Sequence, residues 1–414
     1  MAVFRAFKAL RPTEGKVAQV AALPYDVVNR EEAAAIGKEN PDSFLHVDRA
    51  EIDLPADTDL YDKRVYQMAR ENLLRMEKRG ILVQDEKPCY YIYELVRRGK
   101  SQTGIVGCAS IDDYLNGVVK KHELTKPEQE QDRIDHMDVC DANTGPIYFA
   151  CRYTEALAAF LEQWKNEHKA VCDFTEEDEI THRVWVIDQD NAIDLIRTEM
   201  EKIPAFYIAD GHHRAASAVK VGLKRRQENP GYTGEEEFNY FLSVAFPHEQ
   251  LTILAYNRVV KDLNGQSVEQ VLEKIKEKFD MTIVPGFPAK PVEKHCFGMY
   301  LDGFWYLLKA KPVIYEGKAV ADQLDSQILQ ENVLKPILGI DDPGTDRRIS
   351  FVGGIHKLRE LQSMADETGG IAFALYPASI EELMQLADEN RLMPPKSTWF
   401  EPKLRSGIFI HKLS

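Results

Sequence analysis

Apolar and polar positions along the chain predict strands and helices in turn. The apolar run 89–96, a polar turn and the run 102–109 predict a β-hairpin. Residues 154–168 have the spacing of an amphipathic helix, 183–187 form a short apolar strand pattern, and 192–201 predict another helix. This order predicts a mixed α/β fold (α+β mixed).

The N-terminal part also shows both a strand pattern and helical spacing. Residues 17–23 are β-compatible, and Asn29 is placed to cap a helix that begins at Glu31. Residues 56–80 predict a longer helix, because their apolar side chains follow one face and a glycine ends the run. We expect this helix to serve as scaffold.

Beyond residue 264 the pattern restarts. A helix is predicted over 268–279 and strands near 298–301 and 305–308. A chain of 414 residues is too long for one ordinary core. We therefore predict a phosphate-binding α/β region over 1–264 and a C-terminal α/β region over 265–414 that packs on it.

The strongest chemical signal follows the apolar strand 206–209. It is the sequence Asp-Gly-His-His-Arg at 210–214, which leads into a helix with small apolar residues on one side. Gly211 permits close backbone approach, the helix start offers unpaired N–H groups and a positive dipole end, and Arg214 can grip phosphate oxygens. The pattern predicts a phosphate cradle.

The side chains of this segment suit further chemistry. Asp210 can hold Mg²⁺ or accept a hydroxyl proton, while His212 and His213 can donate to phosphate or transfer protons near neutral pH. The structural alternative is that Asp210 caps the helix, Arg214 bridges a carboxylate, and the histidines satisfy buried polar partners.

The segment 120–144 is rich in charge and poor in large apolar residues, and is either a solvated connector or an active-site loop. His122 and Glu123 match the start of the zinc motif HExxH, but Lys126 stands where the second histidine is needed, which excludes a zinc protease. Glu123 or Asp132 is a candidate general base or Mg²⁺ ligand. Lys126 and Arg133 would offset phosphate charge.

Other chemistry-bearing positions give weaker signals. Asp26 follows a strand-like segment, and the clusters 346–348 and 396–398 combine cations with hydroxyl or acidic groups. A turn or capping role explains Asp26 equally well. A Walker A loop, a GxGxxG turn after a strand and a G-x-S-x-G elbow are all lacking, which disfavours the common nucleotide and hydrolase folds.

Composition narrows the class of partner. With 52 basic and 67 acidic residues, the net charge of −15 repels polyanions and disfavours extended nucleic-acid binding, although a local pocket for one nucleotide is compatible. No apolar run reaches the ~20 residues that cross a bilayer, so we expect a cytoplasmic protein without a membrane partner. Six cysteines without a CxxC pair are expected to be reduced.

Several motifs taken together resemble one known family. They are the segments at 23–27, 40–47, 51–55, 209–214 and 393–403. On these the chain is identified as a member of the bacterial and archaeal domain-of-unknown-function family one thousand and fifteen. The resemblance covers essentially the whole chain.

The loop at 210–214 also resembles the Gly-x-His-Arg loop of the ParB and sulfiredoxin superfamily, which includes nucleotide-dependent free-serine kinases. This implies a ParB/sulfiredoxin-like core elaborated with additional α/β subdomains, in which Gly211, His213 and Arg214 contact nucleotide phosphates. Sulfiredoxins have cysteine where His212 stands, so the loop is closer to that of the serine kinases. The acidic net charge disfavours the DNA-binding branch of the superfamily.

Together these observations predict a Mg²⁺-dependent phosphotransferase that uses ATP or ADP and acts on a small hydroxylated metabolite, with free serine as the first candidate. Asp210, Glu123 and His212 would be catalytic, and Asp210 and Glu123 would hold the metal. Gly211, His213, Arg214, Lys126 and Arg133 would bind the nucleotide. The alternatives are a nucleotide-binding sensor without catalysis and a phosphoester hydrolase that uses a histidine.

Overall fold

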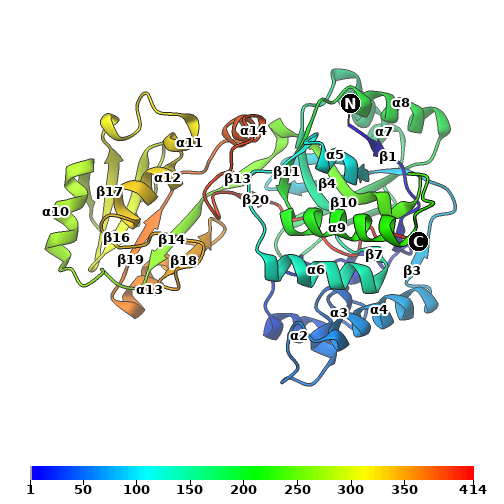
Figure 1. The fold of residues 1–414 in the computed structure, drawn as a ribbon, viewed down its shortest axis with the longest axis horizontal. Coiled ribbons are helices and arrows are strands. Elements are labelled where there is room, and N and C mark those ends of the chain that lie inside the picture. Colours follow the sequence, from blue (N-terminus) through cyan, green and yellow to red (C-terminus); the bar gives the residue numbers. More distant parts are fainter. Residues whose placement is uncertain (1) are drawn as a thin grey trace. The chain divides into compact units, whose positions relative to one another are not determined.

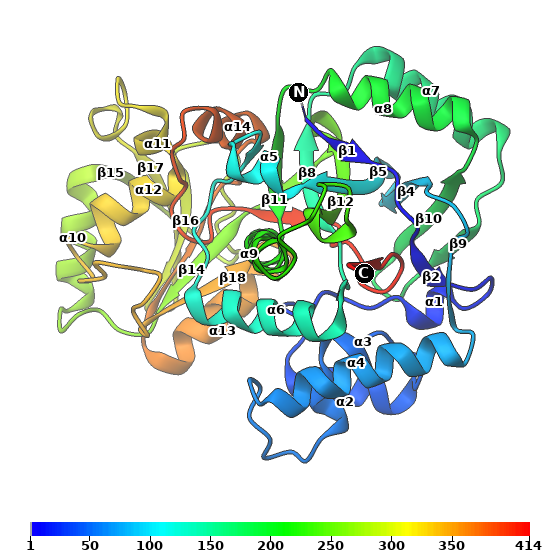
Figure 2. The same cartoon turned by 45° about the vertical axis from the view of Figure 1, so that its right-hand side comes forward.

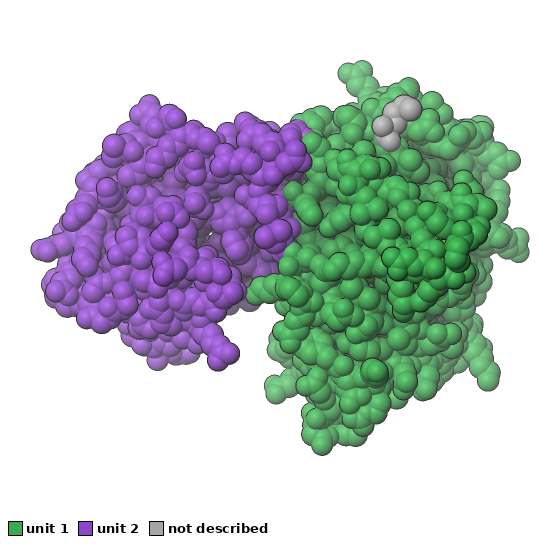
Figure 3. Space-filling view, in the orientation of Figure 1, with its two compact units in different colours: residues 1–121, 125–251, 402–414 green, residues 122–124, 252–401 purple. Residues whose placement is uncertain are grey.

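The computed structural model describes residues 2–414, which form two compact units. Unit 1 contains residues 1–121, 125–251 and 402–414, and unit 2 contains residues 122–124 and 252–401 (Figure 3). The contacts thus divide the chain after Leu251 and return its last residues to unit 1. A division into separate domains at residue 264 stays a prediction.

Unit 1 is built on a nine-stranded sheet with the order β6-β11-β8-β12-β5-β4-β10-β9, and β1 pairs with β5 at its side. β11 runs parallel to β6 and β12 runs parallel to β8, while the other pairs are antiparallel. The strands are β1 Phe4–Arg5, β4 Tyr90–Arg97, β5 Lys100–Ser110, β6 Val119–Lys120, β8 Ile147–Cys151, β9 Cys172–Thr175, β10 Ile180–Ile187, β11 Phe206–Asp210 and β12 Tyr240–Pro247. The sheet is therefore mixed.

Helices cover this sheet, as Figures 1 and 2 show. The helices of unit 1 are α1 Val17–Val20, α2 Arg30–Glu39, α3 Leu45–Asp48, α4 Lys63–Lys78, α5 Ile111–Leu115, α6 Pro127–Cys140, α7 Glu155–Glu167, α8 Asp190–Glu201 and α9 His212–Glu228. Two short pairs complete it, β2 Leu10–Pro12 with β3 Leu82–Gln84 and β7 Ala142–Asn143 with β21 His411–Lys412.

The central strands are buried on both faces because nearly all their residues are apolar. Phe149 of β8 stacks on Phe206 of β11 with ring centroids 5.2 Å apart, and Val219 of α9 belongs to the same core cluster. This packing places the end of β11 and the start of α9 on a rigid base.

Unit 2 has its own six-stranded antiparallel sheet, in the order β15-β17-β16-β19-β14-β18. Its elements are β14 Tyr256–Val260, α10 Val268–Lys278, β15 Phe279–Val284, β16 Cys296–Leu301, β17 Phe304–Ala310, α11 Val320–Gln323, α12 Asp325–Leu329, β18 Ile349–Gly353, α13 Leu358–Thr368, β19 Ile371–Ala374 and α14 Ile380–Asp388. A separate pair joins β13 Thr252–Leu254 to β20 Trp399–Glu401. Among the described residues, no helix is both long and apolar enough to cross a bilayer.

Several predicted elements are confirmed, including the α/β class itself. The hairpin is β4 and β5, and the predicted helices over 154–168, 192–201 and 268–279 are α7, α8 and α10. Asn29 caps α2 in a capping box with Glu32.

Two local predictions are wrong. Residues 17–20 form a helical turn, because Val17 and Val20 are three residues apart and one turn buries both. The segment 120–144 is not a loop, since it contains the 14-residue helix α6. Its helical pattern is hidden because the buried face of α6 includes the polar residues Glu130, Arg133 and His136.

A partly buried acid in unit 2 predicts a pH dependence of stability. Burial, with a contribution from the charge of Glu382, raises the pKa of Asp325 from 3.8 to about 7. A folded-state pKa above the unfolded value stabilises the fold most below pH ~4, and this contribution is lost as the pH rises through ~7. We expect the free energy of unfolding of the native protein to fall, relative to an Asp325→Asn variant, between pH 5 and pH 8.

Denaturant unfolding of both proteins at the two pH values measures this change. The exposed turn residue Asp302 in the same unit provides the control variant Asp302→Asn, whose difference from the native protein should not change with pH. An equal Asp325→Asn difference at both pH values would contradict the prediction.

Candidate functional site

The segment 210–214 forms a sharp strand-to-helix turn. β11 ends at Asp210, Gly211 has a φ of 93°, and α9 begins at His212. No side chain caps this helix start. The backbone N–H groups of the first turn of a 17-residue helix thus lie next to Asp210, which gives the positive dipole end predicted from the sequence.

Arg214 fixes the shape of this turn. Its Nη1 donates to the carbonyl of Pro146 at 2.7 Å, and its Nη2 lies 3.7 Å from Oδ2 of Asp210. A Cβ atom added at Gly145 would lie 3.1 Å from Nη1, and one added at Gly211 would lie 3.2 Å from Nε. The guanidinium group therefore occupies a slot that exists because both neighbours are glycines.

Asp210 has a second cationic neighbour that the sequence did not single out. Nζ of Lys403 lies 3.5 Å from Oδ2 of Asp210. The two residues are 193 positions apart, so no local pattern connects them. The side chain of Asp210 is 26% exposed and that of Lys403 is 11% exposed, so the carboxylate is the more accessible member of the pair.

His213 is held by the start of α6. Its Nε2 accepts a hydrogen bond from the backbone N–H of Lys126 at 3.0 Å, which assigns the ring proton to Nδ1. α6 packs beside α9, as Figure 2 shows, and the hydroxyl of Ser217 donates to the carbonyl of Glu130 at 2.9 Å. Lys126 thus reaches the predicted site through its backbone, while its side chain is exposed.

His212 is also placed at this turn, as the first residue of α9. Its side chain is buried. The sequence-predicted residues of 210–214 are therefore brought together, but their side chains differ in access, because Arg214 and His212 are buried and Asp210 and His213 are half-buried.

Arg133 is buried, and its role in binding a nucleotide stays a prediction. It pairs with Asp132 at 2.7 Å and lies over the ring of Tyr25 at 4.0 Å. Burial lowers its pKa, but the charge of Asp132, with Tyr25 and Asp48, outweighs burial and raises the pKa overall. The hydroxyl of Tyr66 donates to Asp132 at 3.0 Å. Arg133 and Asp132 therefore balance each other as interior support.

A small cavity borders the side chain of Arg214. Its lining includes Tyr25, Asp48, Arg133, Thr144 and Arg214, and its volume is about 20 Å³. A space of this size holds about one water molecule. A nucleotide cannot enter a space of this size.

His122 and Glu123 belong to unit 2. The carbonyl of His122 accepts from the backbone N–H of Met393 at 2.8 Å, and its Nε2 lies 3.3 Å from Oγ1 of Thr398. Two motifs that lie far apart in the sequence, 122–126 and 396–398, are thus in contact through His122 and Thr398. Glu123 is half-buried, and its pairing with Asp210 at one metal ion stays a prediction.

The remaining candidates take structural positions or lie at the surface. Arg348 pairs with Asp346 at 2.9 Å and donates to the carbonyls of Leu338 and Gly339 at 3.0 and 2.7 Å, which ties down a loop of unit 2. Asp26 is exposed. All six cysteines are free thiols, as expected from the sequence.

The turn geometry predicts a cost for a side chain at Gly211. A left-handed φ costs a non-glycine residue about 1–2 kcal/mol, and the added Cβ would also press on Arg214. We expect Gly211→Ala to lower the free energy of unfolding by more than Gly117→Ala. Gly117 is the matched control, because it has a φ of 75° with no atom near the added Cβ. Denaturant unfolding measures both, and equal losses would contradict a role for the Arg214 contact.

Comparisons with solved structures give three distant likenesses. A free serine kinase in complex with AMP shares 13% identity over 77% of this chain and 92% of its own, with a TM-score of 0.38. A conserved hypothetical protein from Pyrococcus furiosus shares 14% identity over 74% of this chain and 94% of its own, with a TM-score of 0.36. SbnI with a C-terminal truncation, from Staphylococcus aureus, shares 11% identity over 72% of this chain and 82% of its own, with a TM-score of 0.36.

A free serine kinase is thus among the matches, but TM-scores this low establish no ligand for this chain. No curated protein matches it. The family model described as "Protein of unknown function (DUF1015)" matches residues 4–327, and the chain therefore belongs to the DUF1015 family.

Proposed function

We propose that the protein is a Mg²⁺-dependent phosphotransferase that moves a phosphoryl group from ATP or ADP to a hydroxyl group of a small metabolite, with free serine as the first candidate. The observation that carries the proposal is the turn at Gly211, where an uncapped helix start lies beside Asp210 and Lys403. Helix starts of this kind bind phosphate through backbone N–H groups.

The anionic phosphates would be held on the outer side of the turn. Backbone N–H groups of Gly211, His212 and His213 and the Nδ1–H of His213 are the predicted donors. Lys403 adds charge at the same edge, and Arg214 acts through its position beside Asp210. Phosphoryl transfer requires mainly positioning and charge neutralisation, which such a set of donors and cations can supply.

The carboxylates would serve the metal and the acceptor. Mg²⁺ is commonly bound by one or two carboxylates together with substrate phosphates, and it would neutralise phosphate charge when bound. Asp210 is accessible at the turn and fits as one such ligand, and Glu123 is the predicted second. One of the two carboxylates would accept the proton of the attacking hydroxyl group.

The activity is tested by ³¹P NMR of the protein with Mg²⁺, L-serine and either ATP or ADP, beside a sample without serine. We expect a new phosphomonoester signal only when serine is present. Shifts of the nucleotide signals without a new signal would favour a nucleotide-binding sensor. Release of inorganic phosphate without any need for serine would favour a hydrolase, and unchanged spectra would remove the serine kinase proposal.

Lys403 gives a sharper test because the same segment carries a matched lysine. Lys412 pairs with Glu77 at 3.0 Å, whereas Lys403 lies beside Asp210 at 3.5 Å. We expect Lys403→Ala to slow turnover by about a hundred- to a thousandfold, the range for losing one preorganised donor at a developing charge, while Lys412→Ala leaves the rate unchanged. Equal rates in the two variants would contradict the assignment.

The two carboxylates are separated by the isosteric variants Asp210→Asn and Glu123→Gln. Loss of turnover with retained nucleotide binding would identify the base, because a base acts on the hydroxyl group and not on nucleotide affinity. A variant that lacks a Mg²⁺ ligand would instead be less active at low Mg²⁺ concentration. Its activity would recover as the Mg²⁺ concentration is raised. Full activity in both variants would contradict both roles.

A further inference from the structure

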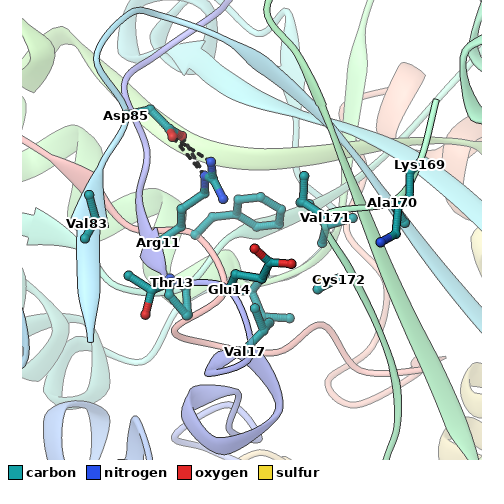
Figure 4. A pocket seen from close by; sticks show the side chains of 14 residues that line it. Arg11, Thr13, Glu14, Val17, Val83, Asp85, Lys169, Ala170, Val171 and Cys172 are labelled. Atoms are coloured by element: carbon teal, nitrogen blue, oxygen red, sulfur yellow. Dashed lines mark hydrogen bonds and ion pairs between the residues drawn. The ribbon is translucent and has the colours of Figure 1, made fainter. Parts of the chain in front are cut away.

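Unit 1 has a second cavity that the proposed function does not use. It has a volume of about 520 Å³ and is lined by residues of β2, of the segment before β9 and of the C-terminal segment (Figure 4). Pockets of ~300–1,000 Å³ are typical of small-molecule sites. None of its lining residues belongs to the turn at 210–214.

The cavity has an apolar floor and an apolar rim. Val184, Ile408 and Phe409 form the floor and are almost fully buried. Val83 and Val171 line the same cavity but are 52% and 41% exposed. Covering apolar surface removes it from water, which favours binding. The site therefore favours a ligand with an apolar body.

One cation of the cavity is held in a fixed position. Nε and Nη2 of Arg11 donate to Asp85 at 2.7–3.0 Å, and the hydroxyl of Tyr91 donates to the same carboxylate at 2.6 Å. Nη1 of Arg11 makes no hydrogen bond to any described residue. Asp85 thus orients the guanidinium group and leaves a donor for a ligand carboxylate.

Two further charges of opposite sign line the cavity. Glu14 and Lys169 are exposed, and neither forms an ion pair with a residue that the structure describes. Figure 4 draws the side chains of Glu14 and Lys169 among those that line the cavity. The cavity therefore offers a carboxylate for an ammonium group as well as cations for a carboxylate.

We propose that this cavity binds a small zwitterion with an apolar body, of the class of free aromatic amino acids and apolar dipeptides. Arg11 and Lys169 would hold the carboxylate, Glu14 would hold the ammonium group, and the apolar body would cover Val171 and Phe409. The proposal is independent of the phosphotransferase, since the two sites share no residue.

Ligand-detected NMR and calorimetry on the full chain test the proposal with L-phenylalanine and L-leucyl-L-phenylalanine. The matched probes are N-acetyl-L-phenylalanine, which lacks the ammonium group, and L-phenylalaninamide, which lacks the carboxylate. We expect each zwitterion to bind at least about tenfold more tightly than either singly charged probe, a difference of about 1.4 kcal/mol. Equal affinities, or no binding of any probe at ~10 mM, would overturn the proposal.

Variants place the binding in this cavity. Val171→Trp should fill the opening and abolish binding, while Val313→Trp, at a valine that is 79% exposed in unit 2, should leave binding unchanged. Glu14→Gln should remove the preference over N-acetyl-L-phenylalanine, and Lys169→Met should weaken the preference over L-phenylalaninamide, because each variant removes a partner of the charge that the probe lacks. Binding that survives Val171→Trp would overturn the assignment, and circular dichroism checks that each variant is folded.

Discussion

The hydrogen bond from Arg214 to the carbonyl of Pro146 is the contact on which the turn at 210–214 depends. A buried guanidinium group is costly unless it is paired and hydrogen-bonded. Here it meets the carbonyl at 2.7 Å and lies near Asp210 at 3.7 Å, in a slot bounded by Gly145 and Gly211. The same bond connects the start of α9 to the segment before β8, so the backbone N–H groups at the turn keep a fixed direction.

A polar interior supports this turn from below. Arg133 and Asp132 are paired near Tyr25, Nε2 of His136 lies 3.0 Å from the carbonyl of Val47, and the hydroxyl of Thr144 donates to Asp48 at 2.7 Å. Burial lowers the pKa of His136, which favours its neutral form. Such networks fix one geometry when every member is satisfied, and they are costly when one member is lost. Side chains that first suggest catalysis thus hold the scaffold.

Local patterns predicted most elements whose apolar spacing is regular, such as α7 and the β4–β5 hairpin, because burial on one face leaves a readable period. They failed for α6, whose buried face is polar, and for residues 17–20, where one turn buries two valines. At the turn, the sequence pointed to 210–214 but not to Lys403, because that contact depends on the tertiary fold. It also could not show that Arg133 is buried.

The pairing of β13 with β20 has a topological consequence. Thr252 lies opposite Glu401, so the chain leaves unit 1 and returns to it at cross-strand neighbours. Opposite residues of an antiparallel pair are only about 5 Å apart. Residues 252–401 are thus an insertion in the sequence of unit 1. Apart from them, unit 2 contains residues 122–124. A short linker that joins Leu251 directly to Pro402 would make unit 1 a continuous polypeptide without residues 252–401. The segment 402–414, which carries Lys403, would stay covalently attached to it.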